Sequence, residues 1–143
     1  MKNNLNTAQH FKPVNGSEKY KKRILVDMSL TTVHHGHVRL LKKASELGRV
    51  IVALVSDEEI YKFKGFYPIL CFENRKEIAL AFKYVEEVIE SSWLIDENFL
   101  DNNNIDLLVH GDDNQNPIPS ARLVIFEKTK EISSTKLRIS NRG

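Results

Sequence analysis

The sequence predicts an α/β fold in three layers, in which helices cover a central, mostly parallel sheet of five strands. Short apolar runs rich in β-branched residues alternate along the chain with segments whose apolar residues recur at helical spacing. A strand, a helix and a second strand follow one another between residues 23 and 56, at a length that suits a right-handed βαβ unit. Because such a unit sets its two strands parallel, the sheet is expected to be parallel.

Strands are expected at residues 23–28, 49–56, 85–90, 105–109 and 123–126. Helices are expected from the histidines at 34–37 up to Gly48, within 57–70, over 73–81 and over 96–102, and a last one starts near Thr135. Ligands of a parallel sheet lie beyond the carboxyl ends of its strands. The segments 29–37, 111–113 and 128–134 each follow a strand, and they are therefore predicted to converge on one edge of the sheet.

The composition indicates one domain over residues 22–143, preceded by a polar tail or arm over residues 1–21. The formal net charge of +2 is too small and too evenly spread to indicate nucleic acid or a membrane surface as a partner. The single cysteine, Cys71, excludes a framework of disulfides within the chain and suits a reducing compartment. No apolar run reaches spanning length and the N-terminus lacks a signal-peptide core, so a cytoplasmic protein is expected.

The turn after the first strand carries the pattern His34-His35-Gly36-His37. Gly36 lets backbone and ligand approach closely, and a helix start offers unpaired N–H groups and the positive end of a dipole. Imidazoles can donate hydrogen bonds to phosphate oxygens. The alternatives are a helix cap, a surface histidine or a zinc site, but the spacing is not that of the usual zinc sites. The pattern therefore predicts phosphate chemistry and leaves the metal ligands unknown.

These residues resemble the His-x-Gly-His motif of the nucleotidyltransferase superfamily. Three further parts of the chain resemble its small cytidylyltransferases, typified by the glycerol-3-phosphate cytidylyltransferases, and they occur in the family's order: 72–76 with 84–89, then His110-Gly111-Asp112-Asp113, then 132–137. The resemblance covers roughly residues 22 to 138 and implies a Rossmann-like form of the α/β fold.

The resemblance also implies roles for individual residues. His34 and His37 would contact the triphosphate of CTP and its transition state, and Lys64 would reach the phosphates from a loop, with Lys62 as the competing choice. The residues expected to bind the nucleotide are Met28, Ser29, Gly36, Gly111, Asp112, Lys128, Thr129, Ile132, Ser133 and Ser134. Further candidates are Lys62, Arg75, Lys83 and Asp113. For Arg75 a purely structural ion pair is the alternative, and for the two aspartates and two serines it is capping of a turn or helix.

Several positions depart from the family pattern: Thr31 replaces an acid, Lys83 and Lys128 replace arginines, Glu131 replaces a glycine, and Asn114 replaces a tryptophan. A lysine keeps the positive charge but loses bidentate contact with phosphate. The pair Met28-Ser29 is similar to the phosphonate-using cytidylyltransferases, which carry Met-Ser at this point.

The function implied by the resemblance is CTP-dependent transfer of CMP to a small phosphorylated alcohol similar to glycerol phosphate. The products would be a CDP-alcohol, for a cell-surface polysaccharide or a lipid head group, and pyrophosphate. Mg²⁺ is expected with the CTP, and a homodimer is expected by analogy. The enzyme alternatives are a phosphonate cytidylyltransferase and, less favoured, an adenylyltransferase. A catalytically weak nucleotide-binding protein is the alternative from a different class.

Overall fold

The computed structural model describes residues 21–127, and within them the chain forms one five-stranded sheet in the order β3-β2-β1-β4-β5. The strands are β1 (Arg23–Met28), β2 (Arg49–Val55), β3 (Val85–Ser91), β4 (Leu107–Gly111) and β5 (Leu123–Phe126). Every neighbouring pair of strands is parallel. The predicted α/β fold is confirmed, and the sheet is parallel throughout.

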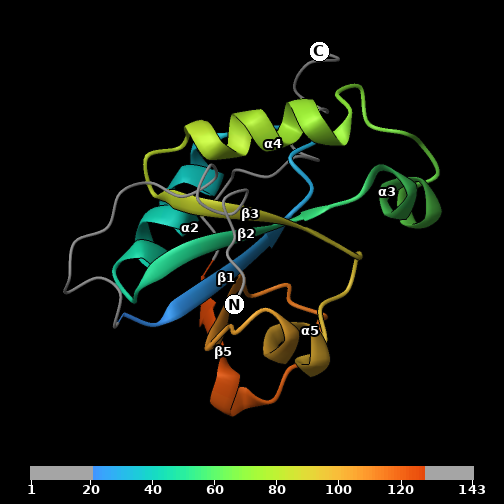
Figure 1. Cartoon of the computed structure of the whole chain (residues 1–143). Helices are drawn as coiled ribbons and strands as arrows, with labels where there is room; N and C mark the ends of the chain where they lie inside the picture. Colours follow the sequence, from blue (N-terminus) through green and yellow to red (C-terminus); the bar gives the residue numbers. More distant parts are fainter. Residues whose placement is uncertain (1–20, 128–143) are drawn as a thin grey trace, which may run out of the picture.

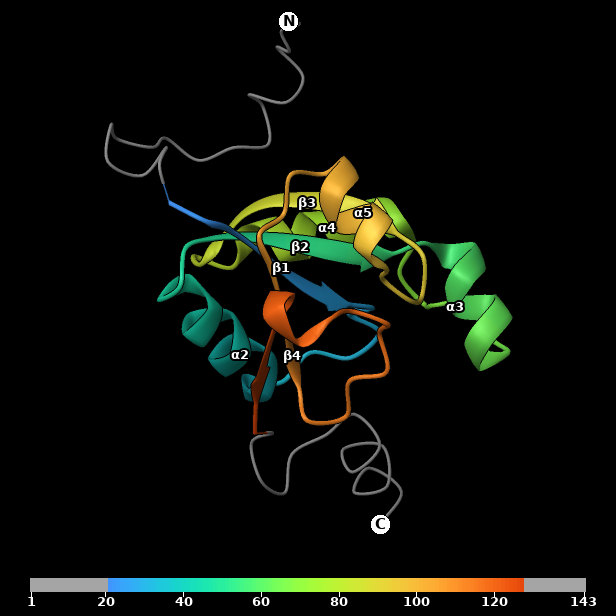
Figure 2. The same cartoon turned by 90° about the horizontal axis from the view of Figure 1, so that it is seen from below.

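The helices place the sheet between two layers (Figure 1). They are α2 (His35–Ser45), α3 (Asp57–Lys64), α4 (Phe72–Ala81) and α5 (Glu97–Asn102), with a 3₁₀ turn at Ser120–Arg122. Figure 1 shows α2 and α4 on one face of the sheet, and Figure 2 views the molecule from the opposite face, which α5 covers. The helix α3 lies apart from both layers, beyond the carboxyl end of β2 (Figures 1 and 2).

Buried side chains fill both faces of the sheet, as expected for parallel strands with helices on either side. On one face, alternate residues of β1 and β2 pack with α2 and α4, among them Ile24, Val26, Val52, Leu41, Ala44 and Ala79. On the other face, the intervening residues pack with α5 and its flanking loops, among them Leu25, Ile51, Leu100, Ile105 and Ile118. In β1 the alternation ends at Asp27, which follows Leu25 on the α5 face and has no apolar side chain to contribute there.

Two predicted boundaries differ from the structure because polar side chains cap helices, and two more differ by a single residue. Ser56, expected to end the second strand, instead accepts a hydrogen bond from the Glu59 N–H at 3.2 Å and caps α3. Asp96, expected inside a helix, caps α5 by accepting from the Phe99 N–H at 2.9 Å. The helix α4 starts one residue earlier than predicted, at Phe72, and β3 ends one residue later, at Ser91.

The fourth strand runs over Leu107–Gly111, two residues later than predicted. Ile105 is buried, but its N–H donates to the Leu100 carbonyl at the end of α5, and Asn104 before it is left-handed with φ 57°. The apolar residue therefore belongs to the helix end, and the strand begins after it. As a consequence, His110 and Gly111 lie within β4 and do not follow it.

Several predictions fall on residues outside the described range of 21–127, among them the last helix near Thr135 and most of the tail 1–21. The division into tail and domain therefore stays a prediction. Within the described range, no helix is long and apolar enough to cross a membrane.

Candidate active site

Two histidines hold the start of α2. The backbone of His34 is extended (φ −148°, ψ 173°), so this residue is the N-cap of the helix. Its Nδ1 accepts from the Gly36 N–H at 3.0 Å, while its own N–H donates to Nδ1 of His37 at 3.1 Å. The two imidazoles thus form a reciprocal capping box, in the places where Ser or Thr and Glu or Gln are usual. The cap that the sequence offered as an alternative is present.

The capping bonds also determine where the rings carry their protons. A ring nitrogen that accepts a hydrogen bond has no proton, so a neutral ring bound in this way carries its proton on Nε2. Burial and the neighbouring His34, whose ring centroid is 4.1 Å away, lower the pKa of His37 to about 4. His37 is therefore neutral at pH 7, and its Nε2–H is a donor suited to a phosphate oxygen. Capping and phosphate binding are compatible because they use different nitrogens.

The structure distinguishes the two lysines proposed for the phosphates. Lys64 is the last residue of α3, and its Nζ lies 5.5 Å from the ring centroid of Trp93, in the loop after β3. The Nζ of Lys62 lies over Phe63 of its own helix, at 5.7 Å. Trp93 lines the pocket described below, so Lys64 is the lysine that α3 brings towards it.

Lys83 has a different position. It stands two residues before the start of β3, and its Nζ lies 5.2 Å from the ring centroid of Tyr84. The amino ends of parallel strands share one edge of the sheet, opposite the edge where α2 begins. The structure therefore does not bring Lys83 together with the histidines.

Arg75 is a buried link between three segments. Its guanidinium donates to the Ser29 carbonyl at 2.7 Å, to Oδ1 of Asp57 at 2.5 Å and to the Leu70 carbonyl at 3.0 Å, and the side chain is fully buried. These bonds tie the turn after β1 to the start of α3 and to the loop before α4. Of its two predicted roles, the contacts support the structural one, a residue that holds the turn leading to the histidines.

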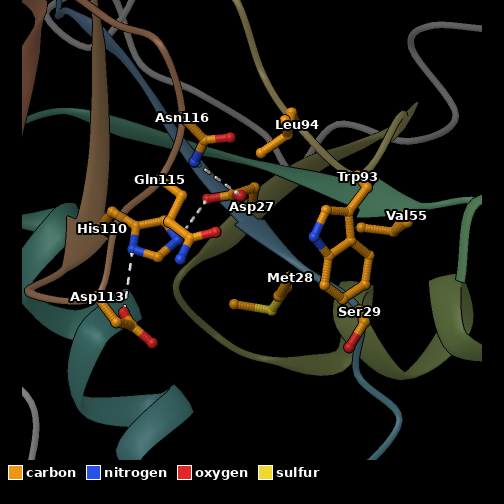
Figure 3. Close-up of a pocket in the computed structure, with 10 residues that line it drawn as sticks. All are labelled: Asp27, Met28, Ser29, Val55, Trp93, Leu94, His110, Asp113, Gln115 and Asn116. Carbon is orange, nitrogen blue, oxygen red and sulfur yellow. Dashed lines mark hydrogen bonds and ion pairs between the residues drawn. The ribbon is translucent and has the colours of Figure 1, made fainter. Parts of the chain in front are cut away.

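A pocket of about 410 Å³ opens at the carboxyl ends of β1 and β4 (Figure 3). Its lining residues are Asp27, Met28, Ser29, Val55, Trp93, Leu94, His110, Asp113, Gln115 and Asn116. Figure 3 shows Trp93 and Val55 on one side and His110 and Gln115 on the other, with Asp27 between them. His34 and His37 do not line the pocket but follow Ser29 by a short turn.

Asp27 is, with Asp113, one of the two carboxyl groups that line this pocket, and it is the less exposed of the two. Its side chain is 10% exposed, its Oδ2 accepts from the Asn116 amide at 3.3 Å, and its Oδ1 lies 3.5 Å from Nε2 of His110. The pair follows from the strand register, because Val26 pairs with Val109 and the next residues lie side by side. Oδ1 has no hydrogen-bond partner among the described residues. Burial raises the pKa of Asp27 above its usual value, while His110 and the bond from Asn116 act in the opposite direction.

The predicted site residues and the pocket overlap in part. Met28, Ser29 and Asp113 line the pocket, and Gly36 lies within the capping box. Gly111 ends β4 and Asp112 is exposed in the turn that follows. The predicted residues outside the described range are Lys128, Thr129, Ile132, Ser133 and Ser134.

Sequence reasoning missed Asp27, Trp93 and Asn116. For Asp27 a signal was available, since it is the single acid in β1 and stands between the apolar residues Val26 and Met28. For a metal, the described residues contain no group of three or more His, Cys, Asp or Glu side chains arranged to hold an ion.

Residues 32–136 match the family model described as cytidylyltransferase-like. The chain belongs to the cytidylyltransferase-like family. This match confirms the predicted membership of the nucleotidyltransferase superfamily and the predicted class of enzyme. The motif at residues 34–37 and the segment at 132–136 both fall inside the matched range.

Two named relatives differ in how much of their length this cytidylyltransferase-like chain covers. It is 30% identical over 122 residues to a glycerol-3-phosphate cytidylyltransferase of Bacillus subtilis, covering 82% of this chain and 95% of the relative. It is 39% identical over 93 residues to an ethanolamine-phosphate cytidylyltransferase of Dictyostelium discoideum, covering 64% of this chain and 26% of the relative. The chain thus spans nearly the whole of the first relative and about a quarter of the second.

A third relative has a different reaction in its name, and a solved structure supports the fold. The chain is 40% identical over 75 residues to an FAD synthase of Pyrococcus horikoshii, covering 52% of this chain and 50% of the relative. The crystal structure of a lipopolysaccharide core biosynthesis protein from Thermoplasma volcanium superposes with a TM-score of 0.64 at 18% identity, covering 76% of this chain and 98% of that one. This likeness confirms the fold.

Proposed function

We propose that this cytidylyltransferase-like protein transfers CMP from CTP to a small phosphorylated alcohol and releases pyrophosphate. The observation that carries the proposal is the pair of imidazoles at the start of α2, beyond the carboxyl end of β1, with the pocket beside it. The relatives named as glycerol-3-phosphate and ethanolamine-phosphate cytidylyltransferases support the same class of reaction.

In the proposed reaction, an oxygen of the acceptor's phosphate attacks the α-phosphorus of CTP. The bond from that phosphorus to the bridging oxygen breaks, and pyrophosphate leaves with the electron pair. Negative charge gathers on the equatorial and leaving oxygens, so the protein acts mainly by positioning the reactants and by aiming donors at this charge. His37 supplies a neutral Nε2–H donor, the N-terminus of α2 supplies its dipole, and Lys64 supplies a positive charge.

Mg²⁺ is proposed to enter with CTP, where it would neutralise charge on the triphosphate. The absence of a three-ligand group within residues 21–127 fits an ion held largely by phosphate oxygens. The segment from Lys128 to Ser134 is proposed, from the resemblance alone, to hold the triphosphate from the other side.

The pocket favours an acceptor that carries an amino group over glycerol phosphate. An ammonium group in this space would lie against the buried Asp27 carboxylate and beside the ring of Trp93, so that charge pairing and a cation–π contact both act on it. A glycerol hydroxyl would make hydrogen bonds only. We therefore infer that aminoalkyl phosphates or aminoalkyl phosphonates are the acceptors. The similarity of Met28-Ser29 to the phosphonate-using enzymes fits the second class.

The test is pyrophosphate release with CTP, Mg²⁺ and a panel of acceptors. The panel pairs phosphoethanolamine and 2-aminoethylphosphonate with glycerol 3-phosphate and ethyl phosphate, which lack the amino group. We expect turnover with an aminoalkyl acceptor and CTP, and much less with ATP in place of CTP. Turnover with glycerol 3-phosphate alone would overturn the choice of acceptor. Binding of CTP without turnover on any acceptor would favour the catalytically weak nucleotide-binding protein.

A further inference from the structure

Asn116 joins three segments around the pocket. The side chain is buried, in the loop between β4 and the 3₁₀ turn. Its Oδ1 accepts from the Ile95 N–H at 2.7 Å, and its Nδ2 donates to Oδ1 of Asn114 at 2.8 Å and to Oδ2 of Asp27 at 3.3 Å. One amide therefore connects the end of β1, the loop after β3 and the loop after β4.

The orientation of this amide follows from its partners. A backbone N–H can only donate, so the atom that faces Ile95 must be the oxygen, and the nitrogen must face Asp27. Figure 3 shows the amide of Asn116 directed at the Asp27 carboxylate, with His110 and Trp93 on opposite sides of that carboxylate. Because a carboxylate accepts from this donor and a protonated carboxyl gains less from it, the bond favours the charged form of Asp27.

The groups that face Asp27 come from two neighbouring elements. His110 on β4 lies 3.5 Å away and attracts the negative charge, while Asp113, in the turn after β4, repels it. Asp113 is itself 3.5 Å from Nδ1 of His110. The donor from Asn116 is thus one of three contacts that offset burial and Asp113, together with His110 and the backbone N–H of Asp27 itself. Through Ile95, two residues after Trp93, it also fixes the opposite wall of the pocket.

We propose that Asn116 is a positioning residue for acceptor selection, which keeps Asp27 charged and holds the Trp93 wall at a fixed distance from it. This inference rests on the proposed function, because it assigns Asn116 to the acceptor and not to CTP. Loss of the donor makes the binding of an aminoalkyl acceptor weaker at low pH. It leaves CTP binding and the chemical step unchanged.

The variant that isolates the donor is Asn116→Asp. It keeps an oxygen for the Ile95 N–H, but it replaces the NH₂ donor with a second carboxylate beside Asp27, and two neighbouring carboxylates resist full ionisation. The matched control is Asn102→Asp, which makes the same chemical change on the exposed surface of α5, away from the pocket. Asn114→Ala is the milder variant, because it removes a support of the Asn116 amide and touches neither Ile95 nor Asp27.

The measurements are KM and kcat for each substrate between pH 5 and pH 9. For Asn116→Asp we expect KM for the aminoalkyl acceptor to rise about tenfold at pH 6, because protons then compete with the acceptor's ammonium group for the Asp27 carboxylate, and a rise of about one unit in the Asp27 pKa gives this factor. KM for CTP and kcat should change less than about twofold. Asn114→Ala should move the same profile in the same direction by less. An equal loss of kcat with every acceptor, or an unchanged pH profile of the acceptor KM, would overturn the proposal.

A titration of the Asp27 carboxyl by ¹³C NMR separates this inference from the proposed function. If no acceptor turns over in the wild-type protein, the proposed function fails, and the titration alone then tests whether Asn116 keeps Asp27 charged. We expect Asp27 to titrate at higher pH in Asn116→Asp than in the wild type or in Asn102→Asp. The same midpoint in all three proteins would overturn the assignment of Asn116.

Discussion

Replacement of Asp27 by asparagine tests the acceptor end of the site most directly. The variant Asp27→Asn keeps the size of the side chain and an oxygen that accepts from Asn116, and it removes the charge. Asp27 is nearly buried, and its Oδ1 has no hydrogen-bond partner among residues 21–127. We therefore expect two opposite effects, a loss of acceptor binding and a gain in folding stability.

The size of each effect follows from the contacts. Two unit charges about 4 Å apart attract by roughly 4 kcal/mol at an effective dielectric constant of 20. Loss of hydration by the ammonium offsets about half of this, so the net loss is about 2 kcal/mol, or about 30-fold in acceptor KM. Removal of a buried charge, one of whose oxygens accepts no hydrogen bond among residues 21–127, should raise the free energy of unfolding by about 1–2 kcal/mol.

The assay compares KM for phosphoethanolamine and for glycerol 3-phosphate in the wild type and in Asp27→Asn, with urea denaturation of both proteins. We expect the loss only with the amino acceptor, an unchanged KM for CTP, and a higher urea midpoint at an unchanged slope. Equal changes for both acceptors would refute the idea that Asp27 recognises a positive charge. A less stable variant would refute the account of a carboxylate held at an energetic cost.

Four further predictions concern the nucleotide end and its support. In His37→Ala, kcat should fall by about 100- to 1000-fold as one aimed donor is lost. In the wild type, the folded-state pKa of His37 of about 4 lies below the unfolded value of 6.5, so the unfolded chain binds more protons and the free energy of unfolding falls as the pH drops from 6.5 to 4. In urea titrations of His37→Ala, this part of the fall should vanish. Its persistence would show that another group causes it. Arg75→Met should lower the free energy of unfolding by about 3–5 kcal/mol, because Asp57 and the Ser29 carbonyl lose a buried partner, and a change below about 1 kcal/mol would contradict the linking role. Lys64→Ala should lower kcat/KM for CTP by at least about tenfold. Lys62→Ala is the matched control on the same helix, and it should change kcat/KM for CTP by less than about twofold. Equal losses in both variants would show that α3 acts only through its general charge.

The fold could be predicted from the sequence where local patterns decide it. β1 and β5 have the predicted bounds, because apolar residues, most of them branched, fill most of each strand and leave little competing structure. The predicted start of β4 was wrong, because Ile105 is apolar in either arrangement and only its contact with the end of α5 decides its place. That contact is tertiary, and no spacing along the chain reveals it.

The candidate site divides in the same way. His34, Gly36 and His37 lie within one turn of helix, so their spacing alone brought them together. Asp27 and Asn116 are 89 residues apart, and they meet because the end of β1 and the loop after β4 lie side by side in the sheet order. An asparagine in a loop carries no local mark of such a role. The structure was needed to find it.

The two ends of the site differ in what a substitution does to the whole protein, and this difference bears on how such an enzyme diverges. A change at His34 or His37 removes a ligand contact and a helix cap together, so activity and folding suffer from the same event. A change at Asp27 weakens one contact but relieves a buried charge. Variants with a new acceptor preference would therefore begin with a higher free energy of unfolding than the parent protein, whereas variants with altered nucleotide chemistry would begin with a lower one. In a family with this architecture, the specificity for the acceptor should therefore change more often during divergence than the specificity for the nucleotide.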